Sequence, residues 1–164
     1  MRVRKLVVLA GAVLVLGVMN FSIWQKENLL ASGRVVLLEL APVDPRSLMQ
    51  GDYMALRFRV ANDAFGRGQK NERQDGRIVV AVDENGIASF KRFDDGASLA
   101  ANEILMRYRV RNNEPKFATN AFFFQEGHAK YYERARYGEF RVSEKGDLLL
   151  TNLRGEKLER LGPQ

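Results

Sequence analysis

The stretch 48–58, LMQGDYMALRF, marks a corner at which the chain turns into a strand. After Tyr53 the side chains alternate between apolar types and polar or small types, which is the period of a half-buried strand. The apolar face of that strand would consist of Met54, Leu56, Phe58 and Val60, with Ala55, Arg57 and Arg59 on the opposite face. The alternation therefore predicts a strand over residues 53–60.

The residues before this strand predict a short helix and a bend. Pro45 fits the first position of a single helical turn over 46–50, and Asp44 fits the capping position before it. Gly51 follows that turn and fits its left-handed terminator, because glycine has no Cβ to clash in that conformation. Gly-Asp-Tyr is thus expected to form a structural corner.

Working outward, most of the remaining chain has the pattern of strands. Apolar or alternating runs predict further strands at 35–40, 104–110 and 117–125. Two hairpins are expected, at 77–93 and at 139–153. The first hairpin encloses Asn85-Gly86, the favoured pair for a type I′ turn.

Three segments interrupt the strand pattern. Residues 61–76 are polar and contain three glycines, which predicts a loop. Residues 127–138, GHAKYYERARYG, have helical spacing and end at Gly138, which predicts a helix. Residues 154–164 are highly charged, and we expect this tail to fray.

A weak internal repeat links the two halves of the chain. VDENG (82–86) and VSEKG (142–146) share the pattern Val-x-Glu-x-Gly, each at the turn of an expected hairpin. The fold class that follows is α+β and mostly β: a small antiparallel domain, barrel-like or sandwich-like, with one or two short helices. The two halves are candidates for one duplicated unit.

The N-terminus has the pattern of a transmembrane helix. Residues 1–5, MRVRK, are basic, and residues 6–24 contain no charged side chain. As a helix the uncharged run is about 28 Å long, which matches a hydrocarbon core of about 30 Å. A cleaved signal peptide is the main alternative, with small residues at 29–33. A buried soluble helix would require a larger protein to cover it.

These observations divide the chain into three parts. Residues 1–28 are expected to be an uncleaved signal-anchor helix, 29–153 a β-rich domain, and 154–164 a polar tail. Basic residues before an apolar segment orient the N-terminus to the cytoplasm. The location that follows is the bacterial inner membrane, with the β-rich domain in the periplasm.

Composition excludes several classes of function. The chain has no cysteine, which excludes disulfides, thiolate metal sites and cysteine nucleophiles. Its net charge is +6, but beyond residue 33 there are 22 Lys and Arg against 19 Asp and Glu. A nucleic-acid-binding protein would carry a clustered excess of basic residues. We therefore expect no nucleic-acid partner.

Residues 40–58, LAPVDPRSLMQGDYMALRF, resemble the signature of the GDYXXLXY family of bacterial proteins. The matching motif positions are Gly51, Asp52, Tyr53, Leu56 and Phe58, with Phe58 in place of the final tyrosine. Four upstream residues and one later pair also resemble the family: Pro42, Asp44, Pro45 and Arg46, and Glu126-Gly127. The resemblance implies an anchored extracytoplasmic domain without an assigned activity. It further implies a multi-pass membrane protein as partner.

Few residues offer catalytic chemistry. Asp44 and Asp52 flank the expected bend, and paired carboxylates can act as acid and base. One alternative is therefore a hydrolase-type enzyme that uses both acids, with Glu126, in a cleft. Local bonding to the backbone is the commoner role of short acids at turns. Ser47 has no evident base, and His128 is the only histidine, so we expect no catalytic residue, metal or cofactor.

Two groups of side chains are candidates for binding. An aromatic cluster near residues 122–137 predicts a core, or else the pocket of a small-ligand sensor. Arginines on two expected strand faces would share one surface if the strands are neighbours: Arg57 and Arg59, with Arg107, Arg109 and Arg111. Such a surface would face solvent, or bind anionic lipid or an acidic partner. The sequence favours a non-catalytic accessory subunit of a membrane protein complex.

Overall fold

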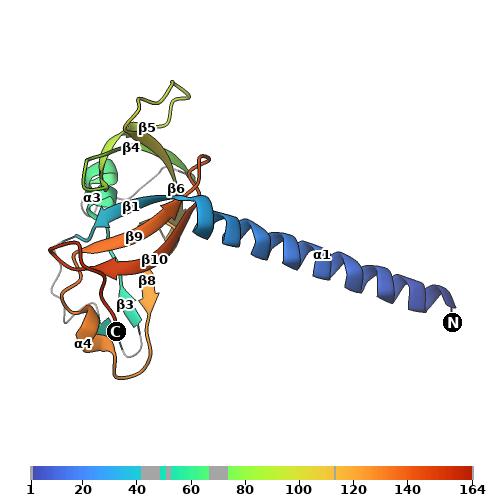
Figure 1. Ribbon diagram of the computed structural model, residues 1–164. Helices are drawn as coiled ribbons and strands as arrows, with labels where there is room; N and C mark the ends of the chain where they lie inside the picture. Colours follow the sequence, from blue (N-terminus) through green and yellow to red (C-terminus); the bar gives the residue numbers. More distant parts are fainter. Residues whose placement is uncertain (1, 42–48, 51–52, 67–73, 113, 164) are drawn as a thin grey trace.

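The computed structural model describes residues 2–41, 49–50, 53–66, 74–112 and 114–163. A single long helix, α1 (Arg2–Ser32), projects from a compact β-rich body, which we call the β-domain (Figure 1). The helix continues beyond the expected end at residue 28 and stops at Gly33, whose N–H donates to the Leu29 carbonyl at 2.9 Å. Residues Arg4–Ser32 are long and apolar enough to cross a membrane.

Seven strands form the main sheet in the order β10-β9-β1-β5-β4-β6-β7. Their bounds are β1 (Arg34–Glu39), β4 (Gly76–Val82), β5 (Ile87–Phe93), β6 (Glu103–Arg111), β7 (Glu114–Lys116), β9 (Tyr137–Val142) and β10 (Leu148–Arg154). The expected hairpins are both present, as β4–β5 and β9–β10. All neighbours are antiparallel except β1 and β5, which run parallel.

The sheet curls until strand β6 meets the β9–β10 turn. The Arg107 N–H donates to the Gly146 carbonyl at 2.8 Å. At the equivalent place in the first half, the Leu37 N–H donates to the Gly86 carbonyl, also at 2.8 Å. In addition, β1 pairs with β9 of the second half, and β6 pairs with β4 of the first half. The two halves therefore share the same kind of hydrogen bond between a turn and a strand, and each half contributes a strand that pairs with the other half.

The two hairpin turns have the same construction. In each, the residue after the shared valine accepts a backbone N–H four positions later: Asp83 Oδ1 from Ile87 at 2.8 Å, and Ser143 Oγ from Asp147 at 3.0 Å. Gly86 has a φ of 82° and Gly146 a φ of 86°. The expected type I′ turn is wrong, because such a turn needs positive φ at both central residues and Asn85 is not among the described residues with positive φ.

A smaller sheet has the order β2-β3-β8, with bounds Met49–Gln50, Tyr53–Ala55 and Ala121–Phe123. It corrects two expectations around the opening motif. Met49 and Gln50 form a strand and not the end of a helix. The strand expected over 53–60 ends at Ala55, and the short helix α3 (Arg59–Phe65) begins where a strand and then a loop were expected.

Tertiary packing explains why α3 forms there. Val60 is buried, and the Phe65 ring packs edge-on against Phe93 and Tyr108 at centroid distances of 5.4 and 4.9 Å. A helical turn places both α3 side chains over the main sheet, which a continuing strand would not do. Figure 1 shows α3 beside the β4–β5 hairpin.

The second expected helix is also shorter than the sequence indicates. Helix α4 covers only Ala129–Tyr132, and Tyr137 already belongs to β9. Gly138, expected as the end of the helix, is buried within β9. A Cβ on Gly138 would lie 3.0 Å from the Phe140 ring and 3.1 Å from the Phe58 ring. This glycine therefore serves close packing in a strand.

The C-terminal tail packs against the sheet through residue 161, contrary to the expected fraying. The Leu161 N–H donates to the Leu153 carbonyl at 2.9 Å, and the Leu161 side chain is buried. The Arg154 guanidinium donates to the Leu158 carbonyl at 2.7 Å. Backbone and side-chain bonds together therefore hold the tail.

One hydrophobic core lies between the curled main sheet, the small sheet and α3. Fully buried members come from both halves of the chain, among them Leu38, Leu56, Ile78, Met106, Phe117, Phe140 and Leu153. The predicted alternation along β6 is confirmed, since Met106 and Tyr108 are buried and Arg107 and Arg109 are exposed. The apolar side chains of α1 contribute nothing to this core, because they are exposed along the helix.

Candidate functional site

The described part of the opening motif is built into the core. Leu56 and Phe58 are buried, and the Phe58 ring packs edge-on against Phe140 at 5.3 Å. Tyr53 is half-buried, with its ring 5.7 Å from that of Phe123. Phenylalanine at position 58 needs no partner for a hydroxyl in this apolar setting. The motif residues Asp44, Pro45, Arg46, Gly51 and Asp52 lie outside the described residues.

The later pair that resembles the family forms a surface turn. Gly127 has a φ of 79°, which explains the glycine, and Glu126 is exposed beside it. The His128 N–H donates to the Gln125 carbonyl at 3.0 Å and closes the turn. Across the described residues, no three His, Asp or Glu side chains are grouped so that they could hold a metal ion.

The aromatic cluster is partly core and partly surface. Tyr132 packs against Phe122 and Phe124, with centroid distances of 5.0 and 5.4 Å. A shallow hollow of about 430 Å³ lies beside it, lined by Phe123, Phe124, Gln125, His128, Tyr132 and Pro163. Phe123 is 74% exposed at its edge. The hollow is open, so it would cover only part of a small ligand.

Sequence reasoning missed the buried carboxylate of Glu139 in β9. It is the only buried charged residue among those described, with 1% of its surface exposed. The Arg154 Nε donates to Glu139 Oε2 at 2.5 Å, and the Arg160 Nη2 donates to Glu139 Oε1 at 3.0 Å. Burial raises the pKa of Glu139, but the hydrogen bonds and charges of the two arginines outweigh it and lower that pKa overall.

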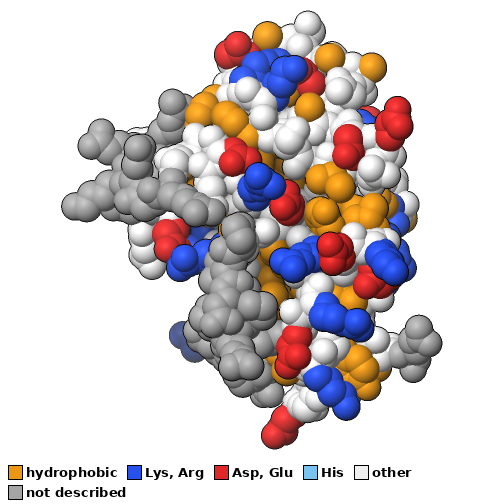
Figure 2. All heavy atoms as spheres, turned by 90° about the vertical axis from the view of Figure 1, so that its left-hand side faces the viewer, with side chains coloured by type: hydrophobic (Ala, Val, Ile, Leu, Met, Phe, Trp, Pro, Cys, Tyr) orange, Lys and Arg blue, Asp and Glu red, His pale blue; other side chains and the backbone are white. Residues whose placement is uncertain are grey.

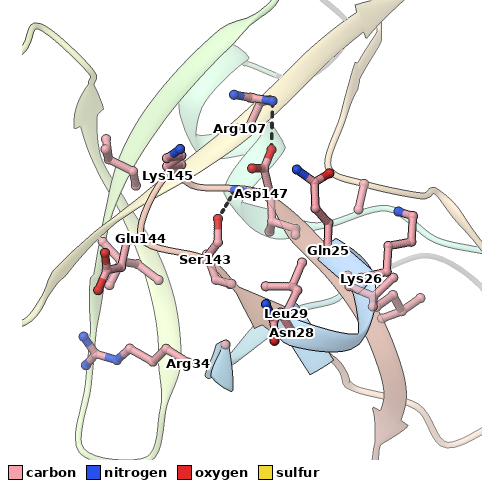
Figure 3. Close-up of a pocket in the computed structure, with 18 of the residues that line it drawn as sticks. Gln25, Lys26, Asn28, Leu29, Arg34, Arg107, Ser143, Glu144, Lys145 and Asp147 are labelled. Carbon is pink, nitrogen blue, oxygen red and sulfur yellow. Dashed lines mark hydrogen bonds and ion pairs between the residues drawn. The ribbon is translucent and has the colours of Figure 1, made fainter. Parts of the chain in front are cut away.

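A cavity of about 1330 Å³ lies where α1 leaves the β-domain. We call it the junction cavity. Figure 3 shows its walls: Gln25, Lys26, Asn28 and Leu29 come from the last turns of α1, Arg107 comes from β6, and Ser143, Glu144, Lys145 and Asp147 come from the β9–β10 turn. The Arg141 guanidinium donates to the Gly33 carbonyl at 2.9 Å and fixes the start of β1 against β9.

Cations outnumber acids around the junction cavity. Its lining holds the cations Lys26, Arg34, Arg107, Arg109, Arg111, Lys116 and Lys145 and the acids Glu103, Glu144 and Asp147. Two of the cations are paired, Arg107 with Asp147 at 2.8 Å and Arg111 with Asp75 at 3.0 Å. The other five cations form no ion pair within the described part of the chain.

Local hydrogen bonds keep one acid, Asp75, ionised beside this cavity. Asp75 accepts the Val110 N–H at 2.8 Å as well as the Arg111 guanidinium. These bonds, the backbone one first, lower the pKa of Asp75 below its ordinary value, with a smaller contribution from the charge of Arg109. Asp75 therefore stays ionised and partly balances the cations of β6.

The structure does not bring the five expected arginines onto one surface. β3 pairs with β2 and β8, whereas β6 belongs to the main sheet. Arg57 and Arg59 lie beside the far end of β1, where Arg59 pairs with Glu39 at 2.9 Å and the Arg57 carbonyl accepts the Ala41 N–H. Arg107 and Arg109, by contrast, line the junction cavity with Arg111.

Comparisons with known proteins give one match. A family model described as GDYXXLXY protein matches residues 15–153, which is most of the chain. Searches of curated proteins and of solved structures found no significant match. The matched region begins inside α1 and ends in β10, so it includes both walls of the junction cavity.

Proposed function

The chain belongs to the GDYXXLXY family, and from this premise we propose that it is a membrane-anchored binding subunit of a membrane protein complex. In this proposal α1 spans the bacterial inner membrane and the β-domain lies in the periplasm. The subunit acts by binding a multi-pass membrane protein, and it performs no chemistry of its own.

One observation carries the proposal. The apolar side chains of α1 are exposed along its length, as Leu9 and Leu16 illustrate at 63% and 60%. None of the candidate span is buried by the β-domain. A continuous apolar surface of this size is not stable in water and needs lipid or protein to cover it. A bilayer covers it along its whole length.

The flanks of α1 support the orientation. Arg2, Arg4 and Lys5 precede the apolar run, and basic residues at a helix end favour the cytoplasmic side. Trp24 follows the run at the other end, where aromatic side chains anchor helices at the interface. The β-domain begins directly at Gly33, so in this proposal it sits on the periplasmic surface of the inner membrane.

Because the chain has no cysteine, single-cysteine variants test this topology cleanly. Ser98→Cys places a thiol on an exposed segment of the β-domain, and Val3→Cys places one before the span. A membrane-impermeant maleimide should label the Ser98→Cys variant in spheroplasts and the Val3→Cys variant only after lysis. Finding the mature chain free in solution, cut near Ala31, would contradict the anchor.

The binding role is tested by isolating the full-length protein in a mild detergent. We expect one multi-pass membrane protein to be recovered with it in a constant ratio. A matched variant, in which residues 6–24 are replaced by a polyleucine span, shows whether α1 or the β-domain makes the contact. Recovery of the chain alone under every mild condition would contradict a binding subunit.

A further inference from the structure

We propose that the junction cavity binds the headgroup of an anionic phospholipid from the outer leaflet. The inference rests on the membrane anchoring proposed above and goes beyond it, because it assigns a ligand class to a specific site. Three features carry it: the position of the cavity, its excess of positive charge and the leucines in its lining.

The cavity begins at the depth of the lipid headgroups. Its α1 wall extends from Ser22 to Ser32 and therefore starts beside Trp24, where the apolar part of α1 ends. The helical residues after Trp24 extend roughly 12 Å, whereas each headgroup layer is about 5–8 Å thick. A lipid beside α1 thus places its phosphate at the level of the α1 residues that line the cavity.

The charge of the cavity is suited to a phosphate. Arg109 of β6 and Lys145 of the adjoining β9–β10 turn both line the cavity, and neither has an ion-pair partner in the described chain. Lys26 and Arg34 add charge from the helix end and the start of β1. Free guanidinium and ammonium groups bind phosphate oxygens strongly where water is partly excluded.

The surface away from α1 lacks such an excess. Figure 2 views the β-domain from the side opposite the helix and shows Lys and Arg interspersed with Asp and Glu over the described residues. Arg59 and Glu39 at the far end of β1 are paired in this way. Among the described residues, cations without an ion pair also occur elsewhere, at Arg57, Lys130 and Arg134, but the cavity lining gathers five of them beside the end of α1.

The lining of the cavity also contains apolar side chains, Leu29, Leu99, Leu105 and Leu149. A free inorganic anion makes no use of these leucines, whereas the glycerol backbone and first acyl carbons of a phospholipid would cover them. The combination favours a lipid headgroup over a dissolved anion.

The single tryptophan of the chain, Trp24, is a built-in probe for the experiment. Full-length protein is reconstituted into mixed phosphatidylglycerol and phosphatidylcholine vesicles, with bromine on the acyl chains of one lipid at a time. Preferential binding appears as stronger quenching of Trp24 by brominated phosphatidylglycerol at equal mole fraction. We expect about a fivefold preference, because each nearby basic residue strengthens binding to anionic lipid several-fold.

A matched pair of variants locates the preference. The variant Arg34→Gln/Arg109→Gln/Lys145→Gln removes three cavity cations and should reduce the preference to nearly none. The control Arg57→Gln/Lys130→Gln/Arg134→Gln removes three exposed cations outside the cavity lining and should keep it. Equal quenching by both lipids in the wild type, or an unchanged preference in the cavity variant, would overturn the inference.

Two further arms separate the other outcomes. If inorganic phosphate removes the preference while sodium chloride of equal ionic strength does not, the ligand is a dissolved anion and the lipid assignment fails. If the protein does not float with the vesicles at all, the membrane anchor fails. Flotation without a lipid preference leaves the anchor intact and overturns only the lipid site.

Discussion

At the scale of single residues, Glu139 helps to hold the C-terminal tail against the main sheet. A buried carboxylate is costly unless it is paired and hydrogen-bonded. Arg154 and Arg160 satisfy both oxygens, and the Thr151 hydroxyl donates to the Glu139 carbonyl at 3.1 Å. The same contacts hold the last residues of the chain against β9 and β10. This buried acid therefore adds to the backbone bond and the buried side chain of Leu161 in holding the tail.

Replacing Glu139 with glutamine should lower the free energy of unfolding by about 2–3 kcal/mol at pH 7, because two guanidinium groups lose their charged acceptor. The pKa of Glu139 is lowered in the folded state. The stabilisation that the Glu139 carboxylate gives is therefore complete at pH values above its ordinary pKa of 4.5. It is lost as the pH falls through the pKa of the folded state. Urea unfolding followed by near-ultraviolet circular dichroism at several pH values measures both effects.

The control for this experiment is Glu144→Gln, an exposed acid in the β9–β10 turn. It should change stability by less than about 0.5 kcal/mol. The stability difference between wild type and Glu139→Gln should shrink in acid. A difference that stays constant down to pH 3 would mean that the charge of Glu139 is not the source of the stabilisation.

At the scale of elements, the two equivalent turns differ in one respect. A Cβ on Gly86 would meet nothing within 4 Å, whereas a Cβ on Gly146 would lie 3.1 Å from the backbone of Leu105. Both glycines have positive φ. The β9–β10 turn therefore bears directly on β6, whereas the β4–β5 turn contacts β1 through the Gly86 carbonyl and leaves free space beside the Gly86 Cα.

Alanine substitutions should reveal this difference. Gly86→Ala should cost about 1 kcal/mol, the strain of a left-handed alanine. Gly146→Ala should cost about 2–3 kcal/mol, because the added methyl group also pushes β6 away from the turn. Thermal unfolding of both variants measures the two losses. Equal losses would mean that the contact between β6 and the turn contributes little to stability.

The sequence predicted elements whose cause is local. Alternation predicted β6, and apolar runs on either side of a turn predicted both hairpins, because each depends on residues within a short segment. Helix α3 was missed because Phe65 finds its partners on β5 and β6. Gly138 was assigned to the end of a helix because its neighbours Phe58 and Phe140 are visible only in three dimensions.

The candidate site was less predictable than the fold. The sequence identified Arg107 and Arg109 as cations on one strand face, which the structure confirms. It could not place Lys26, Arg34 and Lys145 beside them, because these residues come from three distant segments. Glu139 gave no signal, since an acid in a strand is usually exposed and its partners, Arg154 and Arg160, lie in the expected tail.

At the scale of the whole molecule, α1 and the β-domain do not share a hydrophobic core, but no linker separates them. The core of the β-domain contains no apolar side chain of α1. The connection is Gly33 alone, where a Cβ would lie 2.4 Å from the Leu29 carbonyl oxygen and 3.1 Å from the Arg141 side chain. We therefore expect the β-domain to be stable by itself, although Gly33 holds it close to the end of α1.

Removing residues 1–32 should leave a soluble and folded β-domain. We expect its free energy of unfolding to stay within about 1 kcal/mol of that of the full chain in detergent, because only surface contacts are lost. Size-exclusion chromatography and circular dichroism check solubility and fold. Aggregation of the shortened chain would show that α1 covers part of the domain.

The position of β1 has a consequence for synthesis. This strand leaves the ribosome first, but its neighbours β5 and β9 are made much later. Pairings between distant parts of a chain form slowly, since a long loop must close before any contact is gained. If α1 is inserted in a membrane by then, as we propose, an incomplete sheet would wait at the bilayer surface with its β1 edges unpaired. Translation order thus gives this protein a vulnerable interval, which ends only when the β9–β10 hairpin emerges.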